Sequence, residues 1–191
     1  MRIIAGELKG RRVHLPKGSP IRPATGFVRE LAMNLFTEGR LSAGCFLDLC
    51  AGSGLMGFEA LSRGAVRAIF VEAEPRTAAL LKRSAAALGV AERSVVLSHD
   101  ARRCFGAALR IAGAGGVSAA FLDTPYIPGM AQEVLMRAGQ AVDVLKPDAL
   151  LIVRTPDELP PAAGALTLRD KRRAGNAHLW LYAPMGEGDG G

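Results

Sequence analysis

The sequence predicts a single α/β domain in which helices cover both faces of a mostly parallel sheet. The chain has 191 residues, a length that suits one domain with a full hydrophobic core. From residue 45 onward, short apolar runs typical of buried strands alternate with helical patterns. Repeated strand–helix units of this kind build parallel sheets, which bind ligands at the carboxyl ends of their strands.

The alternation predicts each element in turn. Strands are expected at 45–50, 68–72, 94–98, 119–123 and 149–154, and helices at 55–63, 75–88, 101–109 and 132–145. Pro75 fits the first turn of its helix, and Gly89 fits the position just after its end. Two later apolar segments, 165–168 and 177–182, predict an antiparallel edge that completes a seven-stranded sheet.

A basic extension precedes this core. Segments 2–5 and 12–15 predict a hairpin, and Thr25 could cap a helix that runs to about residue 37. Residues 1–29 carry seven basic side chains against one acid, Glu7, a difference that equals the net charge of +6 on the whole chain. We therefore expect a basic extension over 1–40, the core domain over 41–184 and a disordered tail over 185–191.

Composition excludes several classes of protein. Apolar residues make up 49% and charged residues 22%, as in ordinary soluble domains, and the pI near 9.7 favours an anionic partner. The three cysteines lack metal-ligand spacing and fit a reduced compartment. No stretch is suited to a signal peptide or a membrane span. We expect a cytoplasmic monomer with no metal site and no membrane attachment.

A glycine-rich run follows the first strand of the core, in the order Phe46-Leu47-Asp48-Leu49-Cys50-Ala51-Gly52-Ser53-Gly54. Glycines permit a tight turn and let the backbone approach a ligand at the positive end of the next helix. The spacing Gly52-x-Gly54-x-x-Gly57 also matches the dinucleotide fingerprint. A nicotinamide or flavin enzyme is therefore an alternative at this point.

Acidic residues at the strand ends favour a different cofactor. Asp48 lies just before the glycines, where a carboxylate would repel a pyrophosphate. S-adenosyl-L-methionine instead carries an ammonium and a sulfonium, both cationic. Glu72 could accept hydrogen bonds from both ribose hydroxyls, and Asp100 could face the adenine or simply cap a helix. The predicted cofactor contacts in this region are Asp48, Ala51, Gly52, Ser53, Gly54, Glu72, Asp100 and Ala101.

The fourth strand of the core ends in Asp123-Thr124-Pro125-Tyr126. This run resembles the Asp-Pro-Pro-Tyr motif of amino-nitrogen methyltransferases, with Thr124 in place of the first proline. An exocyclic base amine is a poor nucleophile because its lone pair is delocalised into the ring. Asp123 and the carbonyl of residue 124 could accept its two N–H bonds and orient it for methyl transfer. Tyr126 could stack on an extruded base.

Over nearly its whole length, to about Tyr182, the chain resembles the bacterial small-subunit (16S) ribosomal RNA guanine-N2 methyltransferase family. The marks of this resemblance are Arg2-Ile3-Ile4-Ala5-Gly6 with Gly10-Arg11-Arg12, Arg22-Pro23-Ala24-Thr25 with Val28-Arg29-Glu30, residues 47–54, Glu59-Ala60-Leu61-Ser62-Arg63-Gly64 and the run that begins at Asp123. Gly26 stands where the family usually has Asp, and Thr124 departs from its motif as well.

The resemblance implies a Rossmann-like class I methyltransferase fold. It also implies transfer of one methyl group from S-adenosyl-L-methionine to the N2 amine of a guanine in 16S rRNA, on small ribosomal subunits or their assembly intermediates. Arg22 and Thr25 could close over the cofactor or substrate, although Thr25 suits a helix cap equally well. The predicted RNA contacts are the basic residues Lys9, Arg11, Arg12, Arg29, Lys171, Arg172 and Arg173. The last three also fit a solvated strand edge.

Three other functions remain open from the sequence. A DNA amino-methyltransferase can use the same motif, but the chain lacks an obvious target-recognition insertion. A catalytically weakened protein that binds S-adenosyl-L-methionine and assists ribosome assembly would account for Thr124. An oxidoreductase is the most distant alternative.

Overall fold

The structure, a computed structural model, describes residues 1–13, 26–125 and 127–186. The strands are β1 (Cys45–Leu49), β2 (Arg67–Val71), β3 (Ser94–Leu97), β4 (Val117–Asp123), β5 (Leu145–Thr155), β6 (Ala162–Ala163), β7 (Leu166–Ala174) and β8 (Ala177–Pro184). The α-helices are α1 (Gly26–Leu35), α2 (Glu38–Ser42), α3 (Leu55–Ser62), α4 (Pro75–Leu88), α5 (Phe105–Ala112) and α6 (Met130–Gln140).

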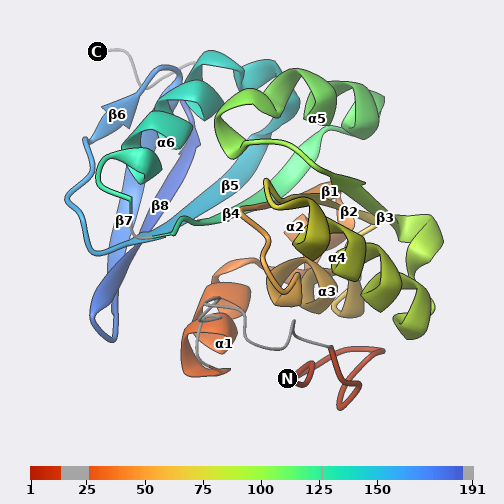
Figure 1. Ribbon diagram of the computed structural model, residues 1–191. Helices are drawn as coiled ribbons and strands as arrows, with labels where there is room; N and C mark the ends of the chain where they lie inside the picture. The colour runs from red at the N-terminus through yellow and green to blue at the C-terminus, as the bar shows by residue number, and fades with distance from the viewer. Residues whose placement is uncertain (14–25, 126, 187–191) are drawn as a thin grey trace.

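One mixed sheet runs through the molecule in the order β3-β2-β1-β4-β5-β8-β7-β6 (Figure 1). The first five strands in this order, β3, β2, β1, β4 and β5, pair in parallel. Strands β8, β7 and β6 add an antiparallel edge. The predicted class is confirmed. The sheet has eight strands rather than seven because the two-residue β6, too short to show a periodicity, pairs with the start of β7.

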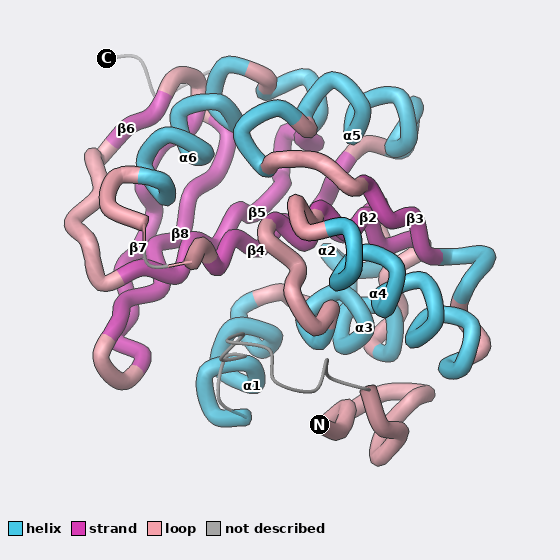
Figure 2. The backbone as a smooth tube through the Cα atoms, in the orientation of Figure 1, coloured by secondary structure: helices cyan, strands magenta, loops and turns pink. Residues whose placement is uncertain are grey.

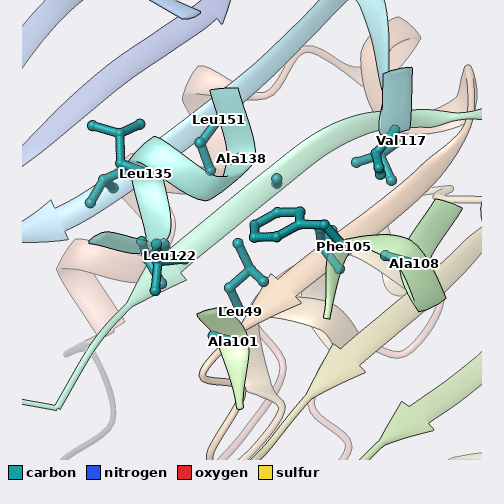
Figure 3. Close-up of a cluster of buried hydrophobic side chains, with 14 of the residues drawn as sticks. Leu49, Ala101, Phe105, Ala108, Val117, Leu122, Leu135, Ala138 and Leu151 are labelled. Carbon is teal, nitrogen blue, oxygen red and sulfur yellow. The ribbon is translucent and has the colours of Figure 1, made fainter. Parts of the chain in front are cut away.

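Helices cover both faces of the sheet, with α5 and α6 above it and α1, α3 and α4 below it in Figure 1. Leu49 of β1 and Leu122 of β4 pack with Phe105 of α5 in the upper core (Figure 3). Phe46 and Phe121, from the same two strands, pack in the lower core. Successive side chains of a strand point to opposite faces, so strands covered on both sides are apolar throughout.

Two predicted helices have different bounds in the structure. Asp100 caps a 3₁₀ turn, Ala101–Arg103, and the α-helix begins only at Phe105. Ala101 and Cys104 continue the buried face of α5, so the periodicity of the sequence hides this change of helix type. Helix α6 ends at Gln140, and a further 3₁₀ turn, Val142–Val144, replaces the expected continuation to residue 145.

The predicted N-terminal hairpin is present as far as the structure describes it, to residue 13. An antiparallel bridge joins Arg2 and Arg12, and the N–H groups of Ile3 and Val13 donate across it to the carbonyls of Arg11 and Met1, at 3.1 and 2.9 Å. The segment is also bonded to α3. Glu59, which is fully buried, accepts from the backbone N–H groups of Ile4 and Ala5 at 2.9 and 3.0 Å. Ser62 Oγ accepts from the N–H of Leu8 at 2.9 Å. Helix α3 therefore holds the segment through side-chain acceptors.

The antiparallel edge is longer than the sequence indicates. Strand β7 continues through residues 169–173, four of which are basic. The register shifts at Arg169, and residues 170–173 pair with β8, for example Lys171 with Trp180. Figure 2 shows this hairpin reaching past the other strands on the same side as α1. Charged residues are common on such exposed edges because they discourage pairing with another sheet. None of the described helices is long and apolar enough to cross a bilayer.

We expect Gly6→Ala to undock the N-terminal segment. At Gly6, with φ of +83°, a Cβ would lie 1.8 Å from the carbonyl oxygen of Ser62. The substitution should lower the free energy of unfolding by about 2 kcal/mol or more, from left-handed strain plus the clash. Urea denaturation measures this loss, and hydrogen exchange should show faster exchange at Leu8.

Gly10→Ala is the matched control. Gly10 has φ of +81°, and a Cβ added there would meet no atom of the described residues within 4 Å, so only the conformational cost of about 1 kcal/mol applies. Equal losses for the two variants would contradict the docking of Gly6 on Ser62.

Candidate functional site

The loop between β1 and α3 has an unusual backbone. Cys50 has φ of +60° without being glycine, and Gly52 and Gly54 have φ of +52° and +73°. Non-glycine residues in this region carry strain and are concentrated at functional sites. The N–H of Ala51 donates to the carbonyl of Val71 at 2.9 Å, which fixes the loop to β2. Ala51 and Ser53 are buried within the loop.

Asp48 lies beneath this loop with 2% of its surface exposed. Its Oδ2 accepts from the N–H of Gly57 in α3 at 2.9 Å. A side chain at 57 would strike the ring of Phe70, since a Cβ there would come within 2.3 Å of it, so glycine allows the helix this close approach. Burial raises the pKa of Asp48 well above its ordinary value, and the carboxylates of Asp123 and Glu72 raise it further.

Glu72 joins two backbone segments just after β2. Its Oε2 accepts from the N–H of Gly52 at 2.8 Å, and its Oε1 accepts from the N–H of Glu74 at 2.9 Å. Each carboxylate oxygen can accept a further hydrogen bond. The carboxylate of Glu72 therefore combines a fixed position beside the glycine loop with spare acceptor capacity.

Of the two roles considered for Asp100, the structure shows the helix cap. Its Oδ1 accepts from the N–H of Arg102 at 2.9 Å, and Ala101 begins the capped turn. The guanidinium of Arg102 also donates to both oxygens of Asp100, and these side-chain hydrogen bonds lower the pKa of Asp100 to about 2. Asp100 is consequently a firmly ionised acid at this edge of the sheet.

Cys50 lies among these acids. Burial raises the pKa of its thiol to about 12, with further contributions from Glu72, Asp48, Asp123 and Asp100. Four carboxylates thus act on one point at the carboxyl ends of the parallel strands. This concentration of negative charge favours a cationic ligand and disfavours a pyrophosphate.

Asp123 ends β4 on the lower face of the sheet, next to the end of β5. Asp123, Thr124 and Pro125 line one side of a cavity of about 110 Å³, and Arg154, Thr155 and Pro156 of the β5 end line the other. Arg154 Nη1 donates to both carboxylate oxygens of Asp123, at 2.8 and 3.0 Å. Burial raises the pKa of Asp123, and Arg154 opposes this rise.

Several predicted site residues lie elsewhere or outside the described ranges. Arg22, Thr25 and Tyr126 are not among the described residues. Arg29 differs from the expected RNA contact, because it is only 5% exposed and its Nη2 donates to the carbonyl of Arg2 at 3.1 Å. Its side chain faces the N-terminal segment instead of solvent, and burial lowers its pKa.

The other predicted RNA contacts are exposed and form two groups, one on the N-terminal segment and one on β7. In the first group, Lys9 and Arg12 are exposed, and Arg11 is exposed but donates to the carbonyl of Ala87. In the second, Lys171 lies 4.0 Å from the centre of the Trp180 ring and pairs with Glu158.

Neighbouring Arg172 pairs with Asp170, and Arg173 Nε donates to the carbonyl of Gly175 at 3.5 Å. The basic group on β7 therefore already has partners, Asp170 and the carbonyl of Gly175 within the hairpin and Glu158 outside it. Its charges reach solvent in a partly neutralised form.

Sequence reasoning missed Arg154 and Cys50 as members of the site. Arg154 had one available signal, a charged residue at the end of an apolar strand that adjoins the strand of Asp123. Cys50 follows the first strand directly, but nothing in the sequence indicates its positive φ.

The fold and this site define a Rossmann-like methyltransferase of class I. The chain belongs to the family described as "Conserved hypothetical protein 95", whose match covers residues 1–183. It is 32% identical to "Putative rRNA methyltransferase YlbH" of Bacillus subtilis, over 97% of this chain and 100% of that protein.

Two Escherichia coli comparisons agree. The chain is 30% identical to "Ribosomal RNA small subunit methyltransferase D" of strain K12, over 99% of this chain and 92% of that protein. It superimposes on the solved structure of "Putative methyltransferase yhhF" with a TM-score of 0.79 and 28% identity, over 96% of this chain and 97% of that chain.

Asp48→Asn should stabilise the unliganded protein. Because the pKa of Asp48 is raised on folding, the stability it contributes is present at low pH and lost as pH rises through that raised pKa. Asparagine still accepts from Gly57 but cannot ionise. We expect a gain of about 1 kcal/mol at neutral pH that disappears in acid.

Thermal unfolding from about pH 3 to about pH 8 measures this difference, because the gain disappears only below the unfolded pKa of an aspartate, about 3.9. Asp143→Asn, at an exposed position of the 3₁₀ turn before β5, is the control and should follow the wild type. A variant at position 48 that loses stability at every pH would contradict the assignment.

Proposed function

We propose that this protein transfers a methyl group from S-adenosyl-L-methionine to the exocyclic N2 amine of a guanine in small-subunit ribosomal RNA. The observation that carries this proposal is the position of Asp123. Its carboxylate lines an open cavity and acts electrostatically on Cys50 and Asp48 of the neighbouring glycine loop. The names of the relatives support ribosomal RNA as the substrate.

The residues of the glycine loop fit the charge of this cofactor. Asp48 is buried without a cationic partner among the described residues, and its ionisation would be favoured by a sulfonium or ammonium nearby. Glu72 has acceptor capacity for ribose hydroxyls, and its hold on Gly52 keeps the loop in place. We assign Asp48, Glu72 and the backbone of Ala51 to Gly54 to the cofactor, with Asp100 and Ala101 at its adenine end.

Asp123 and the carbonyl of residue 124 then act on the target amine. When bound, the cofactor supplies an electrophilic methyl carbon, whose bond to sulfur breaks as the amine nitrogen attacks. Asp123 accepts one N–H and the carbonyl of Thr124 accepts the other, which draws the lone pair out of conjugation with the ring. An Asp123 Oδ takes the proton released by the nitrogen and passes it to water.

Two exposed basic groups are suited to the RNA backbone. Lys9 and Arg12 lie on the segment that α3 holds in place, and Arg172 and Arg173 lie near the turn of the β7–β8 hairpin. Phosphate contacts of this kind fix orientation without reading sequence. We propose that both groups bind the RNA around the target guanine.

Incubation with tritiated S-adenosyl-L-methionine tests the proposal. Unmethylated small subunits, their assembly intermediates, naked 16S rRNA and duplex DNA are offered separately. We expect label in the RNA of a ribosomal substrate, on the N2 of guanine after nucleoside analysis. Asp123→Ala should lower the rate by about a hundredfold or more, because an acceptor of the amine hydrogens is removed.

Asp143→Ala is the control and should label at the wild-type rate, because Asp143 lies just before β5, at the amino ends of the parallel strands. Label only in DNA would reject the RNA assignment. Binding of the cofactor without label in any substrate would indicate the non-enzymatic alternative instead.

The salt dependence of RNA binding tests the N-terminal basic group. Lys9→Gln with Arg12→Gln should reduce the slope of log affinity against log salt by about 0.7–0.9 for each lost phosphate contact. Arg40→Gln with Lys146→Gln removes the same charge at the amino edge of the sheet, where both side chains donate to backbone carbonyls. An equal change of slope in the two double variants would contradict a specific phosphate contact.

A further inference from the structure

The ion pair between Asp123 and Arg154 is an unassigned feature of the cavity. The two residues are register partners on the parallel strands β4 and β5, so their side chains leave the sheet on the same face. The side chain of Arg154 is 14% exposed and that of Asp123 is 23% exposed. The pair is thus buried on one side and borders the cavity on the other.

The geometry of this pair leaves Asp123 able to bind a substrate. A single nitrogen, Nη1, donates to both carboxylate oxygens, at 2.8 and 3.0 Å. A carboxylate has about four acceptor positions, so each oxygen keeps capacity for another donor. Because both oxygens are held, the carboxylate group cannot turn freely. Arg154 therefore restricts the orientation of Asp123, and both carboxylate oxygens can still accept a further hydrogen bond.

The surroundings of Asp123 favour its protonated form, and a cation beside it opposes this effect. Asp123 is half-buried, and it interacts unfavourably with the buried carboxylate of Asp48. Among the influences on Asp123, burial raises its pKa and only Arg154 lowers it. A protonated Asp123 would present one O–H donor toward an amine that itself needs acceptors. The ionised form is the one that suits the amine.

We infer that Arg154 is a positioning residue that keeps Asp123 ionised and correctly oriented to accept the hydrogens of the target amine. The inference rests on the proposed function. It assigns to Arg154 an effect on the reaction through Asp123, in addition to any contribution of the ion pair to folding. The Nε of Arg154 is buried and has no hydrogen-bond partner. The hydrogen bonds from Nη1 to Asp123 are therefore the main contacts that fix the orientation of the guanidinium.

The pH dependence of methyl transfer tests this role. The substrate is the ribosomal RNA form that the wild type labels best, and kcat/KM is measured from about pH 5.5 to about pH 9. In Arg154→Met, Asp123 loses its cation, so the acid limb of the profile should move to higher pH. The rate should fall about tenfold or more near pH 6.5 and recover partly in alkali. Arg154→Lys keeps the charge and should keep the wild-type acid limb with a lower kcat.

Asp123→Asn provides a second, independent measurement. Its amide oxygen still accepts a hydrogen bond but the side chain does not titrate. In this background the acid limb that belongs to Asp123 should vanish, and adding Arg154→Met should cost less than about threefold, since coupled residues are non-additive. Arg67→Met controls for loss of a half-buried arginine, because Arg67 donates to the carbonyl of Ile111 at the other edge of the sheet.

The outcomes separate this inference from the proposed function. If the wild type labels no RNA, the proposed function fails. If the wild type labels RNA but Arg154→Met has the wild-type pH profile, the positioning role is rejected. It is also rejected if Arg154→Met lowers the rate equally at every pH and to the same extent with asparagine at 123. Circular dichroism and calorimetric affinity for S-adenosyl-L-methionine, expected within about threefold of wild type, exclude misfolding as the cause.

Discussion

The register of the parallel strands is the constraint on which the site depends. Asp48 of β1 pairs with Phe121 of β4, and Asp123 pairs with Arg154 of β5. Because side chains alternate along each strand, these registers direct Asp48, Asp123 and Arg154 to the same face. A slip of one residue in β4 would turn Asp123 toward the opposite core and bring Leu122 to the cavity. The apolar residues that fix each strand therefore also fix the chemistry at its end.

The charge balance of this edge differs from that of an ordinary protein core. Carboxylates from four segments act on Cys50, whereas the cations that pair with them are Arg102, beside Asp100, and Arg154, beside Asp123. Buried carboxylates that lie close together destabilise the unliganded fold unless a cation neutralises them. Sites that bind charged ligands often retain such unfavourable electrostatics, because binding relieves them. The destabilisation of the unliganded fold by these carboxylates is consistent with a cationic cofactor, whose binding would relieve it.

Two marks of the family resemblance that are far apart in the sequence meet in space. Glu59 and Ser62 of α3 provide acceptors for the backbone of residues 4–8, and Gly6 passes directly over the carbonyl of Ser62. Ile3, Leu8 and Val13 of this segment also belong to the same buried cluster as Phe58 of α3 and Phe70 of β2, so apolar packing and these hydrogen bonds together hold it in position. Through it, helix α3 connects the glycine loop at its start with a basic surface near its end. A change in the docking of this segment would move the exposed Lys9 and Arg12 without touching Asp123.

The sequence by itself determined the alternation of strands and helices, the glycine loop and the acids at the strand ends. These are local features, since apolar periodicity, Pro75, Gly89 and the spacing of glycines act within a few residues. Only the tertiary structure decided that Arg154 lies against Asp123, that Arg29 is buried and that Asp100 pairs with Arg102. The first two depend on which segments far apart in the chain become neighbours, and the last depends on side-chain conformation. Local pattern specifies neither.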